Sequence, residues 1–142
     1  MDYRRELIEK IKRIGLPRPD RPLPLVSLED FFLGNEDYGS IGCNLSEHPG
    51  PQFFFEELRE IRARADVQDV LVEIQEVEED DESMWPFSDR VYILSSAARE
   101  EEADWVAGLM PDEIEEGFAS GEPPASAPHL RAGTKVYGAW WD

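Results

Sequence analysis

Two apolar segments joined by an acidic stretch constrain the fold more than any other feature of this sequence. Apolar residues recur at every second position within Val67–Val77, which is the pattern of a strand with one buried face. Arg90–Ser95 shows the same pattern, and the charged residues between the two segments indicate an exposed connection. Helical patterns flank this pair at Pro51–Arg64 and Ser96–Leu109. We therefore expect an α+β fold built on an antiparallel sheet.

Two further segments suggest a topology. A short strand at Ser40–Leu45 and a last strand at Thr134–Trp141 complete the order β-α-β-β-α-β from Ser40 onward, with an extra helical turn at Pro111–Glu116. This is the order of a ferredoxin-like fold, in which two helices cover one face of the sheet and the other face stays open. Ala98, Trp105 and Leu109 are expected on the inward side of the second helix.

The N-terminal part is organised differently from the rest. Residues 2–14 carry apolar side chains at helical spacing, and residues 16–24 contain four prolines, as an extended connector would. The sequence thus divides into an N-terminal helix with a Pro-rich connector at 1–24 and a single α+β domain at 25–142. We expect the helix to be an extension that either packs back on the domain or holds a partner.

The charge balance narrows the classes of partner. The chain of 142 residues has 32 acidic and 14 basic side chains, a net charge of −18. Such a surface disfavours nucleic acid and anionic membranes, and it favours a cationic partner such as a basic protein. The N-terminal helix is itself mildly basic, so it has the charge to dock on its own domain. Without a signal-like segment or an apolar run that could span a bilayer, we expect a cytoplasmic protein.

The acidic stretch between the two strands contains the candidate metal ligands Glu79, Asp80 and Asp81. Clustered carboxylates are the ligands of hard cations such as Ca²⁺. The spacing of an EF-hand loop is absent, however, which favours a solvated hairpin tip whose charges repel one another. No bound cofactor is predicted.

An apolar group of Met84, Trp85 and Phe87, followed by Asp89, interrupts this acidic stretch. It either folds back to cap the sheet or forms an exposed anchor among acidic residues, as protein-binding hot spots do. The chain also ends on two adjacent tryptophans, and a strand directs neighbouring side chains to opposite faces. Trp141 therefore joins the four residues above as a candidate for partner binding.

One local set of residues could support catalysis. Cys43, Glu47 and His48 combine a nucleophile, an acid and a base, and a Cys–His pair can generate a reactive thiolate. The spacing across a turn does not impose that geometry, and a lone cysteine in an apolar segment is more often a small buried residue. A small enzyme or small-molecule-binding protein is therefore the alternative to a non-enzymatic interaction module. A homodimer formed through the open sheet face or through the last strand is a further interpretation.

Four stretches of the sequence together resemble a small uncharacterised bacterial family: Val26–Phe32, Gly39–Leu45, Trp85–Asp89 and Trp140–Asp142. This resemblance implies no activity and no catalytic residues. The short chain and its acidic composition are also similar to those of bacterial immunity proteins, which neutralise basic toxin enzymes. The sequence assigns no specific function. The leading hypothesis is a non-enzymatic acidic module, similar to an immunity protein, that binds a basic protein.

Overall fold

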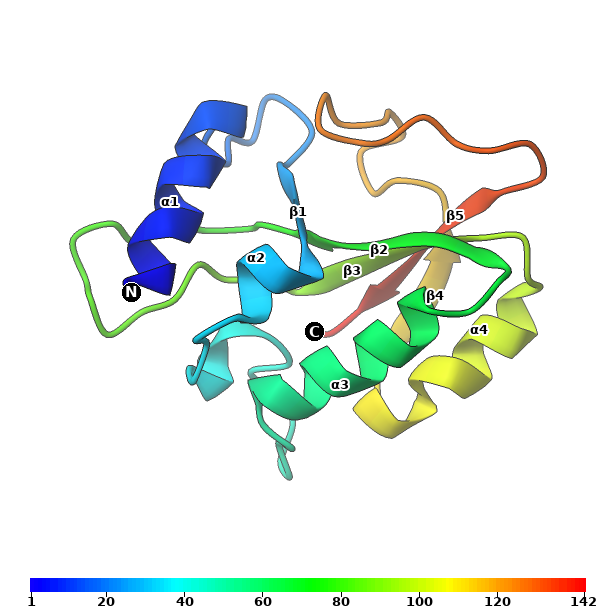
Figure 1. Cartoon of the computed structure of the whole chain (residues 1–142), viewed down its shortest axis with the longest axis horizontal. Coiled ribbons are helices and arrows are strands. Elements are labelled where there is room, and N and C mark those ends of the chain that lie inside the picture. The colour runs from blue at the N-terminus through cyan, green and yellow to red at the C-terminus, as the bar shows by residue number, and fades with distance from the viewer.

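The computed structural model describes residues 1–142 and has five strands in one antiparallel sheet, in the order β1-β2-β3-β5-β4 (Figure 1). The strands are β1 (Leu25–Ser27), β2 (Val67–Glu73), β3 (Arg90–Ser95), β4 (Glu113–Glu116) and β5 (Lys135–Trp140). The helices are α1 (Tyr3–Ile14), α2 (Leu28–Phe32), α3 (Pro51–Arg62) and α4 (Arg99–Val106), with 3-10 turns at Tyr38–Ser40 and Ala107–Leu109. The predicted α+β class is confirmed. No helix combines the length and the apolar character needed to cross a membrane.

The main core lies between the sheet and the helices. Because strand side chains alternate between faces, every second residue of the three central strands points to this side. On α3, Pro51 occupies the first turn, and the helix buries Phe54, Phe55, Leu58 and Ile61 along one stripe. The strand residues that join them in one buried cluster are Val70, Val72, Val91, Ile93, Tyr137 and Ala139.

The opposite sheet face is covered, contrary to the predicted open face. Leu71, Tyr92 and Val136 form a second buried cluster with Phe118 and Leu130, which belong to the long segment between β4 and β5. Figure 1 shows this orange segment on the side of the sheet away from α3 and α4. β5 also pairs with β3 and with β4, so it is an inner strand. Neither surface suggested for a homodimer is therefore free.

The ferredoxin-like topology is not confirmed. Its first strand was predicted at residues 40–45, where the chain instead forms turns, and Gly42 has a positive φ of 62° that interrupts extended backbone. The helical turn predicted at 111–116 is also wrong, because this segment is edge strand β4. Glutamate-rich sequence favours helix locally, and pairing with β5 overrides that preference.

The N-terminal helix packs against the domain. Leu7, Ile8 and Ile11 are at most 5% exposed, and Leu7 and Ile11 belong to the main core. After the Pro-rich connector, the Pro24 carbonyl accepts a hydrogen bond from the Ile74 amide at 2.9 Å as β1 joins the sheet. Of the two interpretations of α1, packing back on the domain is the one seen.

Of the residues predicted on the inward side of the second helix, Leu109 is buried as expected, but the inward face of α4 differs from the prediction. Ala98 is exposed and Trp105 is only half-buried, while Glu102 and Val106 are the helix residues that point into the core. An inward carboxyl group breaks the apolar periodicity on which the prediction depended. The Glu102 side chain accepts a hydrogen bond from Ser95 Oγ at 3.0 Å, and its other oxygen has no partner.

Candidate functional site

The acidic segment between β2 and β3 is held by α1. The Arg4 guanidinium donates hydrogen bonds to four backbone carbonyls of this segment: 2.7 Å to Glu78, 3.3 Å to Glu79, 2.8 Å to Asp81 and 2.8 Å to Met84. Charge-assisted bonds of this kind are stronger than neutral ones. The hairpin tip that the sequence predicts to be solvated is therefore held to the N-terminal helix through Arg4.

The candidate metal ligands are not brought together around a common point. Glu79 pairs with Lys12 of α1 at 2.5 Å, and Asp81 Oδ1 accepts hydrogen bonds from the amide and hydroxyl of Ser83 at 3.0 and 2.6 Å. The Ser83 bonds lower the pKa of Asp81. Asp80 is exposed, and the structure contains no group of three His, Cys, Asp or Glu side chains that could hold a metal ion.

The apolar group at 84–87 folds back onto the core. Trp85 is 9% exposed, and its indole Nε1 donates to the Phe31 carbonyl at 2.8 Å while its amide donates to Asp37 Oδ2 at 3.0 Å. Phe87 is half-buried and forms a bridge with the residues that follow β2. Met84, at 41% exposure, is the apolar member of this group that can offer its side chain to a partner.

Trp141 and Asp89 are also structural. Trp141 is 1% exposed, its ring lies edge-on to Phe54 with centroids 5.5 Å apart, and its Nε1 donates to the Leu109 carbonyl at 2.8 Å. The Asp89 carbonyl accepts a hydrogen bond from the Trp141 amide at 2.9 Å, and burial raises the pKa of the Asp89 carboxyl group. Trp141 could contact a partner with its ring only if the core opened, so it is a core residue, whereas Trp85 keeps a small exposed part of its surface.

The proposed Cys43–His48 pair is not assembled for catalysis. Cys43 and Glu47 are exposed on a turn. His48 Nδ1 accepts a hydrogen bond from the Gly50 amide at 2.8 Å, so its Nε2 carries the proton and donates to the Ile41 carbonyl at 2.6 Å. Because backbone groups occupy both ring nitrogens, neither is available to take a proton from the thiol. His48 serves to shape the turn.

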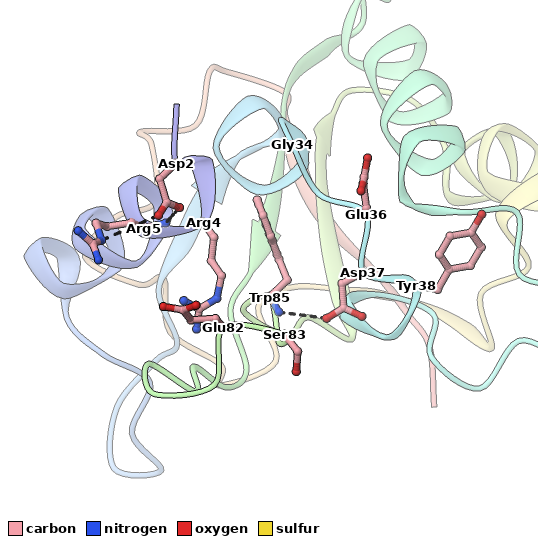
Figure 2. Close-up of a pocket in the computed structure, with 10 residues that line it drawn as sticks. All are labelled: Asp2, Arg4, Arg5, Gly34, Glu36, Asp37, Tyr38, Glu82, Ser83 and Trp85. Atoms are coloured by element: carbon pink, nitrogen blue, oxygen red, sulfur yellow. Dashed lines mark hydrogen bonds and ion pairs between the residues drawn. The ribbon is translucent and has the colours of Figure 1, made fainter.

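The structure reveals a cavity that the sequence analysis missed, of about 590 Å³ (Figure 2). We call it the Trp85 cavity. Its walls come from the start of α1, the segment after α2 and the segment before β3, and its lining residues are Asp2, Arg4, Arg5, Gly34, Glu36, Asp37, Tyr38, Glu82, Ser83 and Trp85. These three segments lie far apart in the sequence, and no local spacing signals that they meet.

Most charged groups around the Trp85 cavity already have partners. Arg4 bonds to the acidic segment, and the Arg5 guanidinium lies 4.0 Å from the Asp2 carboxylate. The two oxygens of Asp37 each accept a hydrogen bond, from the backbone amides of Gly39 and Trp85 respectively. The carboxylates of Glu36 and Glu82 remain exposed and make no hydrogen bond or ion pair within the chain.

Comparison with known proteins assigns the family. The sequence model described as "Uncharacterized protein YfbO family" matches residues 2–139. The chain belongs to the YfbO family. A relative named "Uncharacterized protein YfbO" from Escherichia coli (strain K12) is 39% identical over 125 residues, which cover 87% of this chain and 86% of the relative. The resemblance to a small uncharacterised family is thus confirmed. No solved structure matches the chain.

Arg4 should measurably stabilise this YfbO family fold. We expect Arg4→Ala to lower the free energy of unfolding by about 2 kcal/mol, because several charge-assisted hydrogen bonds to the acidic segment are lost together. The neighbouring variant Arg5→Ala is the matched control, since its side chain is 77% exposed and should contribute less than about 0.5 kcal/mol. Urea unfolding of both variants measures the difference. Equal losses would show that Arg4 does not fix the segment.

Proposed function

We propose that this protein is a non-enzymatic interaction module whose acidic surface binds a basic protein. The supporting observation is the distribution of its ion pairs. Eight of the 14 basic side chains lie within 4.0 Å of a carboxylate, and Arg4, Arg21 and Arg99 instead donate to backbone carbonyls. Those pairs use only ten of the 32 acidic side chains, which leaves 22 without an internal ion pair.

Unpaired carboxylates favour a cationic partner for two physical reasons. Their summed field speeds the encounter with a positively charged protein, and a bound cation relieves the repulsion among them. On β4, a side-chain hydrogen bond with Glu115 and, second to it, the charge of Glu115 raise the pKa of Glu113. Immunity proteins that neutralise basic toxin enzymes belong to this class of acidic binder. The proposal includes such a partner and a cytoplasmic location.

Affinity capture at two salt concentrations tests this function. With the protein immobilised and a lysate of the source organism applied, we expect a basic protein to be retained at about 50 mM NaCl and released at about 500 mM, because salt screens exposed charges. The recovered protein, once purified, should bind the full chain in a calorimetric titration with an affinity that falls as salt rises. A matrix carrying a neutral protein of similar size is the control. Recovery of proteins with no basic bias, together with binding that salt does not affect, would contradict the proposal.

A further inference from the structure

We infer that the Trp85 cavity is the anchoring point of this interaction and that its occupant is an arginine side chain of the basic partner. The inference rests on the proposed function and adds to it a place and a ligand chemistry. The volume of about 590 Å³ lies within the usual range of ligand cavities, which is ample for one long side chain.

The charge of the cavity selects a cation. Its lining residues include four carboxylates and two guanidinium groups, so the balance is negative. The two arginines already contact other groups of the chain, whereas Glu36 and Glu82 are unpaired. Figure 2 shows these two carboxylates on opposite sides of Trp85, Glu82 on the side of Arg4 and Glu36 on the side of Tyr38.

The shape and the aromatic residues favour a guanidinium over an ammonium group. Tyr38 is 57% exposed at one side of the cavity, and Trp85 forms part of its lining. A planar guanidinium can stack on an aromatic ring and donate paired hydrogen bonds to a carboxylate, which a lysine cannot do. An arginine held by aromatic and acidic groups is a common form of binding hot spot.

A neighbouring groove shows why this cavity is the better site. The groove between α1 and α2 has a similar volume of about 560 Å³, but Arg5, Lys10 and Arg13 line it. Among its carboxylates, Asp30 is already paired with Lys10 at 2.7 Å, and Glu29 is paired with Arg62 at 2.5 Å. The four carboxylates and three cations of the groove leave a balance of one negative charge, against two in the Trp85 cavity, which has only two cations.

Nuclear magnetic resonance of the full chain tests the site with arginine amide as the probe. We expect the Trp85 indole signal and the Glu36 and Ser83 amide signals to shift and saturate with a dissociation constant in the millimolar range, as is usual for so small a ligand. Citrulline amide has the same shape without the charge and should cause no saturable shift. The double variant Glu36→Gln/Glu82→Gln should weaken arginine binding about tenfold or more, which corresponds to about 1.4 kcal/mol.

A second double variant separates this site from general attraction to the acidic surface. Glu100 and Glu101 on α4 are exposed and take part in no ion pair, so Glu100→Gln/Glu101→Gln removes the same charge elsewhere. It should leave the shifts at Trp85 unchanged. Equal weakening by both double variants, or equal shifts with citrulline amide, would overturn the site. If a basic protein is still captured in a salt-dependent way in that case, the proposed function stands and only the position of the arginine is wrong.

Discussion

Replacing Trp141 with alanine is expected to lower the free energy of unfolding by about 4 kcal/mol, the usual cost of truncating a large aromatic residue in a packed core. Trp141 is 1% exposed, packs edge-on against Phe54 and donates its indole N–H to the Leu109 carbonyl. The alanine variant loses this packing and leaves the carbonyl without its partner. Denaturant unfolding followed by circular dichroism measures the loss.

The adjacent tryptophan provides the control. Trp140 is only half-buried and lies on the other face of the sheet, so Trp140→Ala should cost about 1 kcal/mol, well below the loss at Trp141. Trp141→Phe keeps the aromatic ring and should fall between the two alanine variants. A stability of Trp141→Ala close to that of the unmodified protein would mean that the last residues of the chain do not complete the core. Trp141 would then return to the set of residues available to a partner.

Stability should fall as pH rises from about 5 to about 9, and Glu102 should cause much of this fall. Burial, with a smaller effect of the Asp66 charge, raises the pKa of Glu102 to about 8, against the partial opposing effect of the Ser95 hydrogen bond. In the unfolded chain a glutamate titrates near 4.3. Below that value both states are protonated and the group has no effect on stability. Between the two values the unfolded state gives up its proton while the folded state keeps it, which costs about 1.4 kcal/mol per pH unit.

The loss should level off above the pKa of the folded state, after a total of several kcal/mol. Glu102→Gln removes the charge and should make unfolding midpoints much less sensitive to pH across this window. Burial also raises the pKa of Glu73 and of Asp89, which act in the same direction, so the comparison with Glu102→Gln isolates the contribution of Glu102. Glu100→Gln, at an exposed position on the same helix, should keep the full pH dependence. The same alkaline loss in Glu102→Gln would rule out Glu102 as its source.

The elements that were predicted correctly are those whose evidence is local. The alternation in Val67–Val77 and Arg90–Ser95 and the stripe of apolar residues in α3 each depend on side chains that lie within one segment. β4 was missed because its glutamates are exposed, and an edge strand of four residues carries almost no periodic signal. The burial of Glu102 was missed because a charged residue in a helical pattern predicts an exposed position.

The candidate site shows the same division between local and long-range information. That Met84, Trp85 and Phe87 interrupt an acidic segment is visible in the sequence, and so is the choice between folding back and facing a partner. Only the structure shows that Trp85 folds back, because its hydrogen-bond partners come from Phe31 and Asp37, about fifty residues away. The cavity beside it exists only where three distant segments meet.

The sequence by itself determined the α+β class, the strong negative charge and the mildly basic N-terminal helix, since composition and short-range periodicity are enough for each. Only the tertiary structure decided which groups the charged side chains contact. Lys12 pairs with Glu79 and Arg4 binds the backbone of the acidic segment, while Glu36 and Glu82 stay unpaired at a cavity. The physical reason is that pairing of charges depends on distances of a few ångström between segments remote in sequence, and packing of the core sets those distances.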